Sequence, residues 1–416
     1  MKGVIIDRGW TRQEIERQMT EIGVDWRGIE IMTDKFQHYI IRLFELTPRQ
    51  ASIIKQEMLA RGAEAAVSWQ ICSMDFGGMA KTGLLLSGTL RQLYQFIAKL
   101  KLQPFGLPDL AERIENALDN YRNDRPVLTL AGRSYDWSVK TYVMGIINIT
   151  PDSFSGDGLY RDKNFIEAAV EQALQMIEDG ADFLDVGAES TRPGTLMNRG
   201  TFPVNGDAAR VSAEEEERRL LPVIKELANA VKIPISVDTY KPSVAEKALN
   251  LGAAMINDIW GLQSPEDPER RMAKLIGETG VPIIMMHNRS QSGYAHLMRE
   301  IIDSLAESIE IAQSAGARKE QLIIDPGIGF GKSHQDNLSV LAHLDQLKIL
   351  GCPVLLGTSR KSVVGLTLDL PVEERLAGSL ATVAWGISQG VNIVRVHDVK
   401  ETVRAVKMCD AIRSAN

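Results

Sequence analysis

Polar side chains follow a series of short apolar segments in this sequence. In residues 144–158, MGIINITPDSFSGDG, an apolar stretch ends at Asn148, and Pro151 prevents a helix from starting there. Seven later apolar segments end in the same way, at Asp185 with Glu189, Asp238, Asn257 with Asp258, His287 with Asn288, Asp325, residues 359–361, and Arg395 with His397. Asp238 and Asn257 alone could cap turns, but together they could hold a flat heterocycle, because carboxylates and amides bond ring nitrogens and amino groups.

The segment LIIDPGIGFGKSHQDN suggests two uses for Asp325. A buried carboxylate could accept two hydrogens from an aminopyrimidinone edge while the glycines bring the backbone close to a ligand. Alternatively, Asp325 caps its own glycine turn. We reject a Walker phosphate loop, since Pro326 stands where that pattern needs glycine and we expect no helix directly after Ser333.

Cationic side chains indicate where an anion would bind. Alternation along a strand puts Arg395 and His397 on one interior side, and a buried Arg needs an anionic partner. With Asn148 on the adjacent first strand, a diphosphate would fit, with Mg²⁺ held by Asn148 and phosphate oxygens. The six histidines show no arrangement of three close zinc ligands, and we expect His287 to be structural.

Two further segments each allow a structural and a functional interpretation. In LLGTSRKSVVG, Arg360 and Lys361 could be a solvated face, yet Ser359 and Ser362 lie at an expected helix N-terminus, where anions bind. In DVGAESTRPG, Arg192 and its neighbours could form a surface turn or a lid over a site.

The polar ends require elements that bring them together. We predict strands at residues 142–149, 183–187, 234–238, 255–259, 282–287, 322–325, 353–357 and 393–397, separated by helical stretches such as 165–178, 243–251 and 376–388. Several helices end in glycine before the next strand. Eight such units within residues 138–416 predict an α/β fold of the (β/α)8 TIM barrel type, rather than a doubly wound open sheet, with its chemistry at the strand C-termini.

Residues 1–125 predict a smaller α+β domain, and residues 126–137 a linker. HYIIRLFEL, AAVSW and GLLLSG are typical of strands. Helices are expected over residues 48–61, with Thr47 as N-cap and Pro48 at the first position, and over residues 89–102. The domain carries none of the strand-end groups, so we expect a packing or assembly role.

Composition narrows the class of protein. The 416 residues carry a net charge of −7 with scattered Lys and Arg, so no nucleic-acid partner is expected. No apolar run reaches the roughly 20 residues of a membrane span, and we expect no signal peptide, because residues 1–7 lack its apolar stretch. Three widely separated cysteines argue against a disulfide framework and against a cysteine metal site, and we expect a reducing cytoplasm as the compartment.

Seven motifs in order, NITPDSFS, ESTRPG, SVDT, NDI, DPGIGFGK, TSRKS and RVHD, resemble the dihydropteroate synthase family over roughly the last two-thirds of the chain. The resemblance implies a transferase of folate biosynthesis on a TIM barrel that forms a homodimer. Its substrates would be 6-hydroxymethyl-7,8-dihydropterin diphosphate and p-aminobenzoate, joined with release of pyrophosphate. The reaction would be an SN1-like displacement that uses Mg²⁺ and no protein nucleophile.

The resemblance also implies roles for individual residues. The pterin would be bound by Asp238, Asn257, Asp325 and Lys361, with Met286 and Phe330 lining its slot. Asn148 would hold Mg²⁺ and diphosphate, and Arg395 and His397 the phosphates. The p-aminobenzoate site would be completed by Phe154, Thr191, Arg192 and Pro193, and Ser362 would receive the carboxylate. Asp238, Lys361, Phe154, Thr191 and Arg192 would act in catalysis.

The chain departs from the family pattern in three places. SFSGDG replaces the common SFSDGG and moves Asp157 by one position, residues 195–210 form a long insertion, and residues 1–125 match nothing in the core pattern. Two rival functions remain open at this point. One is a methyltransferase that moves a methyl group from methyltetrahydrofolate to a corrinoid protein, and the other is a non-catalytic pterin-binding protein.

Overall fold

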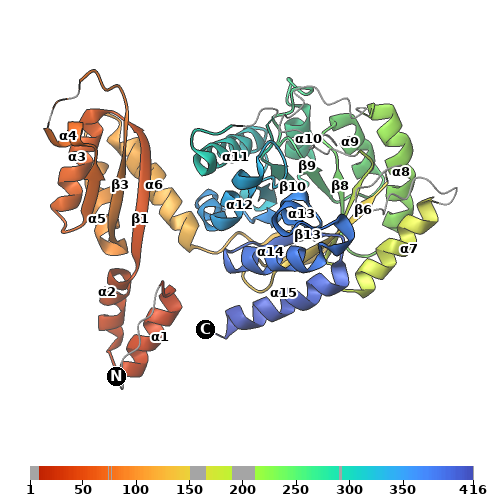
Figure 1. Cartoon of the computed structure of the whole chain (residues 1–416), viewed down its shortest axis with the longest axis horizontal. Coiled ribbons are helices and arrows are strands. Elements are labelled where there is room, and N and C mark those ends of the chain that lie inside the picture. The colour runs from red at the N-terminus through yellow and green to blue at the C-terminus, as the bar shows by residue number, and fades with distance from the viewer. Residues whose placement is uncertain are drawn as a thin grey trace. The chain divides into compact units, whose positions relative to one another are not determined.

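The computed structural model describes residues 9–73, 75, 77–149, 165–189, 211–289 and 293–415. The described residues form two compact units, one up to Asp119 and the other from Asn120 to Ala415 (Figure 1). The division falls within one helix, α6 (Leu107–Arg122). Within the described part of the chain, no helix combines the length and the apolar character needed to cross a membrane.

The N-terminal unit is a small α+β domain, as predicted. Its antiparallel sheet has the order β1–β3–β2, formed by His38–Leu46, Thr82–Thr89 and Glu64–Val67. The helices before α6 are α1 (Arg12–Ile22), α2 (Trp26–Phe36), α3 (Pro48–Leu59), α4 (Trp69–Ser73) and α5 (Leu90–Leu100). Thr47 caps α3 as expected, since its side chain accepts from the backbone N–H of Gln50. Ile54, Leu86 and Phe96 are fully buried in the apolar core.

The second unit is a (β/α)8 barrel, which confirms the predicted fold class. Its eight parallel strands follow the order β11–β10–β9–β8–β7–β6–β13–β12, and a bridge between Ile324 and Val354 joins the two ends of the sheet. In chain order the strands are β6 (Tyr142–Asn148), β7 (Phe183–Gly187), β8 (Ile235–Asp238), β9 (Met255–Asp258), β10 (Ile283–Met286), β11 (Leu322–Asp325), β12 (Leu355–Leu356) and β13 (Ile393–Val396). Each lies within a predicted strand.

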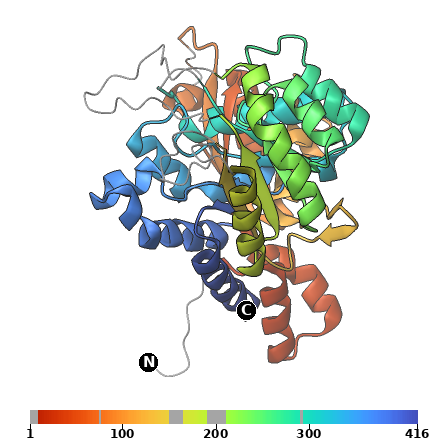
Figure 2. The ribbon, with the colours of Figure 1, turned by 90° about the vertical axis from the view of Figure 1, so that its right-hand side faces the viewer.

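Helices surround these strands (Figure 1 and Figure 2). They are α7 (Phe165–Glu178), α8 (Ala213–Ala230), α9 (Pro242–Asn250), α10 (Arg271–Thr279), α11 (Leu297–Ser314), α12 (His334–Ala342), α13 (Ser362–Leu368), α14 (Leu376–Ser388) and α15 (Val399–Ser414). The expectation that no helix follows Ser333 is wrong, because Ser333 itself caps α12 and accepts from the N–H of Asp336. Pro326 still excludes a Walker loop.

Residues 126–137, expected to be a linker, form a hairpin that belongs to the barrel unit. Its strands are β4 (Leu128–Leu130) and β5 (Arg133–Tyr135). Tyr135 and Trp137 are buried in the cluster inside the barrel, where the ring of Tyr135 lies 4.6 Å from that of Phe183. These apolar side chains fill the barrel at the N-terminal ends of its strands, so the polar side chains lie at the carboxyl ends.

Candidate active site

Parallel register brings the predicted strand-end residues together along one rim of the barrel. Asp238 pairs with Asn257, and Met286 with Asp325. Asn148 and Asp238 both pair with Gly187, which lies between them. A Cβ at Gly187 would lie 3.2 Å from the Cβ of Asp238, so glycine makes room for this carboxylate. The side chains of Asn257, Met286 and Asp325 are all buried.

A network of charge-assisted hydrogen bonds lies at this rim. Arg395 donates through Nε to Oδ2 of Asp185 at 2.5 Å and through Nη2 to Oδ2 of Asp238 at 2.8 Å. Asn257 Nδ2 donates to the same oxygen of Asp185 at 3.0 Å. The anionic partner that a buried Arg requires is therefore supplied by the protein. No role was predicted for Asp185, although its inward position on a predicted strand was a signal.

Burial and neighbouring charges set the protonation of this network. Burial raises the pKa of Asp238 to about 7, against the opposing effect of Arg395 and together with Asp185. Burial acts to lower the pKa of Arg395, but Asp185 and Asp238 outweigh it and raise that pKa above its ordinary value. Arg395 therefore stays charged, and its guanidinium favours the charged form of the Asp238 carboxylate.

The turn after β11 holds Asp325 in place. Gly327 donates its N–H to Oδ1 of Asp325 at 2.7 Å, so the carboxylate does cap its own turn. Gly327 has φ +70°, and a Cβ there would lie 2.0 Å from the carbonyl oxygen of His287, so this position requires glycine. Burial raises the pKa of Asp325, and Lys361 opposes this shift. The cap does not involve Oδ2.

Lys361 and Phe330 lie beside this turn. Lys361 Nζ donates to the carbonyl of Ile328 at 2.6 Å and lies 4.9 Å from the centre of the Phe330 ring. Burial lowers the pKa of Lys361 to about 8, and Asp325 opposes the shift. Phe330 also packs against the apolar cluster that contains Met286 and Tyr240. Together these groups provide an apolar wall beside a cation and a carboxylate.

A second buried lysine, Lys332, ties the turn together. Its Nζ donates to the carbonyls of Gly327 at 2.9 Å and Phe330 at 3.1 Å, and lies 2.9 Å from Nδ1 of His287. Burial lowers the pKa of His287 to about 3, and Lys332 adds to this effect, so the ring stays neutral. The contacts agree with a structural role for His287. We did not foresee the role of Lys332.

The remaining predicted cationic residues, His397 and Arg360, each contact a neighbouring side chain after the ends of β12 and β13. His397 Nδ1 lies 3.0 Å from Oγ of Ser359. Arg360 binds Asp398 through both Nε and Nη2, so it is paired rather than merely solvated. Ser362 is the first residue of α13, with Lys361 at the N-cap.

Several residues singled out from the sequence lie outside the ranges that the structure describes. They are Phe154, Thr191, Arg192 and Pro193, together with Asp157 and residues 195–210. Asn148 is described and ends β6. The described ranges contain no group of three or more His, Cys, Asp or Glu side chains able to hold a metal ion. The amide oxygen of Asn148 is a donor type that Mg²⁺ accepts when phosphate oxygens supply other ligands.

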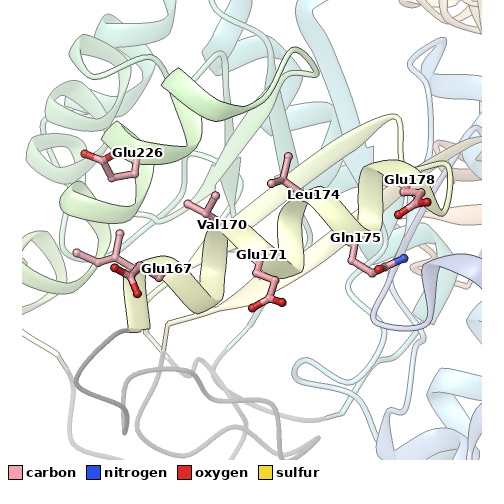
Figure 3. Close-up of a pocket in the computed structure, with 8 residues that line it drawn as sticks. Glu167, Val170, Glu171, Leu174, Gln175, Glu178 and Glu226 are labelled. Carbon is pink, nitrogen blue, oxygen red and sulfur yellow. The ribbon is translucent and has the colours of Figure 1, made fainter.

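A separate surface depression of about 500 Å³ lies along α7. Figure 3 shows Glu167, Glu171 and Glu178 on this helix and Glu226 on α8 around the apolar side chains of Val170 and Leu174. None of the residues that line it is a predicted site residue.

Comparison with known proteins shows the family of this chain. A family described as "Pterin binding enzyme" matches residues 144–397. The chain is 46% identical to a dihydropteroate synthase of Clostridium beijerinckii over 286 residues, which cover 68% of this chain and 99% of that protein. A dihydropteroate synthase of Clostridium difficile, whose crystal structure was determined in the presence of pteroic acid, is 46% identical with a TM-score of 0.60, over 67% of this chain and 98% of that chain.

A third relative also covers part of the N-terminal unit. It is a probable bifunctional folylpolyglutamate synthase/dihydropteroate synthase of Haloferax volcanii, 38% identical over 384 residues, which are 88% of this chain and 42% of that protein. The family match over residues 144–397 thus places the barrel among the pterin-binding enzymes. Within that class, the chain belongs to the dihydropteroate synthase family.

Proposed function

We propose that this chain joins 6-hydroxymethyl-7,8-dihydropterin diphosphate to p-aminobenzoate, giving 7,8-dihydropteroate and pyrophosphate for folate biosynthesis. The observation that carries the proposal is the placement of Asp238, Asn257 and Asp325 at the carboxyl ends of strands in one barrel, with Lys361 at the N-cap of α13 after β12. Membership in the dihydropteroate synthase family supports the same reaction.

We propose that the pterin edge binds to buried acceptors. Oδ2 of Asp325 and the carbonyl oxygen of Asn257 would accept hydrogens from the ring nitrogens and the amino group. Lys361 would donate to a ring acceptor, and Phe330 and Met286 would enclose the faces of the ring. The negative charge of Asp238 would favour the cationic methylene that develops as the diphosphate leaves.

The diphosphate would lie between the first and last strands. Arg395 has further N–H groups beyond the two that bind Asp185 and Asp238, and these could donate to phosphate oxygens. His397 would add a second contact. Asn148 would hold Mg²⁺ with the phosphates, and the ion would supply charge neutralisation of the leaving group.

The amine of p-aminobenzoate would attack the methylene carbon in an SN1-like displacement. Phe154, Thr191, Arg192 and Pro193 would complete its site, and Ser362 would receive its carboxylate. Exclusion of water by these residues would protect the cation from hydrolysis.

We also propose a cytoplasmic homodimer. Exposed apolar side chains on the last three helices of the barrel support the association: Leu366, Leu368, Trp385, Met408 and Ile412. All three cysteines are free, in keeping with a reducing compartment.

The test is pyrophosphate release by the full chain with each substrate alone and with both. Release that requires both the pterin diphosphate and p-aminobenzoate is expected. Binding of the pterin with no release would favour a non-catalytic pterin-binding protein. Methyl transfer from methyltetrahydrofolate to a corrinoid protein, without pyrophosphate release, would favour the methyltransferase.

A further inference from the structure

Asp185 lies one layer below the rim, inside the barrel. Its neighbours on β7 alternate, since Phe183 belongs to the interior cluster while Leu184 and Val186 belong to the outer core under the helices. Asp185 therefore points inward with Phe183. Its exposed fraction is 0%, so it cannot touch a substrate that enters from the rim. Any effect on the reaction must pass through the side chains that it contacts.

The first of these contacts fixes the orientation of Asn257. Nδ2 of Asn257 donates to Oδ2 of Asp185 at 3.0 Å. The opposite orientation would place the amide oxygen against a carboxylate, where two acceptors repel each other. Asp185 therefore turns the oxygen of Asn257 away from itself and keeps it available as an acceptor. An apolar residue at position 185 would leave the amide free to flip.

The second contact fixes Arg395. The same Oδ2 accepts from Nε of Arg395, whose Nη2 reaches Asp238. One oxygen of Asp185 thus holds two neighbours that lie on different strands, β9 and β13. Because a guanidinium is planar, anchoring Nε sets the plane in which its other donors lie.

Packing alone does not account for an acid at this position. Oδ1 of Asp185 has no hydrogen-bond partner among the described residues, although it is buried. A buried polar atom without a partner costs free energy, and an apolar side chain in its place would avoid that cost. The hydrogen bonds that Oδ2 accepts from Asn257 and Arg395 would explain why an acid is retained at this position despite that cost.

We propose that Asp185 is a positioning residue for pterin recognition, which sets the amide orientation of Asn257 and the plane of the Arg395 guanidinium. The inference rests on the proposed function, because it assumes that Asn257 binds the pterin. It predicts that changes at position 185 act on the pterin diphosphate and leave p-aminobenzoate recognition unchanged.

The experiment compares Asp185→Asn and Asp185→Leu with Ser236→Ala in the full chain. Asparagine keeps an acceptor oxygen and removes the charge, whereas leucine removes both. Ser236 is a matched control because it pairs with Asp185 in the sheet, is buried, and makes no hydrogen bond to this network. Calorimetric titration gives the Kd of the pterin diphosphate, and steady-state kinetics give the KM of p-aminobenzoate.

Asp185→Asn is expected to raise the Kd of the pterin diphosphate roughly tenfold, and Asp185→Leu by more, since charge-assisted bonds are lost. The KM of p-aminobenzoate and the properties of Ser236→Ala should not change. An unchanged Kd of the pterin diphosphate would overturn the proposal. An equal rise in this Kd and in the KM of p-aminobenzoate would also overturn it. A wild-type protein that releases no pyrophosphate would instead overturn the proposed function.

A double-mutant cycle with Asn257→Ala tests the route of the effect. Once Asn257 is absent, Asp185→Asn should raise the Kd by a smaller factor than it does alone. Additive effects would contradict action through Asn257. If Asp185→Asn does not fold, Asn257→Asp tests the same bond from the other side, because two carboxylates would repel. Wild-type affinity in Asn257→Asp would then overturn the proposal.

Discussion

The two units of the chain differ in which side chains they bury. Among the described residues of the N-terminal unit, Thr33 is the only fully buried polar side chain, and its hydroxyl bonds the carbonyl of Ile29 in its own helix. The barrel buries Asp185, Asn257 and Asp325 among many others. Both units expose large apolar side chains, such as Trp26 and Trp69 in the N-terminal unit and Trp385 and Met408 in the barrel.

This difference in buried polar groups bears on how the two units divide stability, association and chemistry. Burying polar groups costs free energy, so a fold retains them where their contacts have a use. Exposed apolar surface similarly costs solubility and is typical of interaction sites. We infer that the barrel carries the reaction and that the N-terminal unit serves assembly. The following predictions test that division.

The largest effect is expected from a matched pair of core changes, Phe183→Ala in the barrel and Phe96→Ala in the N-terminal unit. Both rings have exposed fractions of 0%. Each change should lower the free energy of unfolding of its own unit by about 3–5 kcal/mol, measured by urea titration. Only Phe183→Ala should reduce synthase activity. Loss of activity in Phe96→Ala with a folded barrel would break the comparison.

A smaller effect is expected from Asp325→Asn, which places an amide where the pterin requires acceptors. Each lost charge-assisted bond should cost about 1.5–3 kcal/mol of binding free energy, measured by calorimetric titration with the pterin diphosphate. Asp258→Asn is the control, since Asp258 ends β9, two strands from β11 in the sheet, accepts from the N–H groups of Trp260 and Leu262, and is not a predicted site residue. Equal affinity of Asp325→Asn and wild type would refute the assignment.

The buried His287 should make barrel stability depend on pH. Burial lowers its pKa from 6.5 to about 3, so between these values the unfolded chain binds a proton that the folded barrel does not. The free energy of unfolding therefore decreases as the pH is lowered below 6.5, by up to about 1.4 kcal/mol per pH unit from this group. Urea titrations at pH 6 and pH 5 should show a shallower decline for His287→Asn than for wild type. If the free energy of unfolding changed equally with pH in both proteins, the pKa of His287 would not be lowered in the folded barrel.

Local patterns in the sequence predicted the architecture well. Alternating apolar segments and glycine stops placed all eight barrel strands, and Thr47–Pro48 marked the start of α3. These features are set by nearby residues. The hairpin at residues 126–137 was missed because its burial depends on Phe183 and other strands far along the chain.

The site was predictable only in part, for a related reason. Strand ends identified Asp238, Asn257 and Asp325, since the C-termini of parallel strands share one rim. Which groups bond to each other depends on barrel closure, which brings Asp185 to Arg395, 210 residues apart in sequence. No local pattern specifies that pairing, and the same holds for the contacts of Lys332.

The most direct test of the division is the activity of residues 120–416 alone. The fragment should begin at Asn120, because Asn120 bonds the carbonyl of Ile349 and Tyr121 bonds Asp345 within the barrel unit. We expect pyrophosphate release that requires both substrates, with the kcat and KM values of the full chain and an altered oligomeric mass in light scattering. A folded fragment without turnover would contradict the account, because the N-terminal unit would then contribute to the reaction itself.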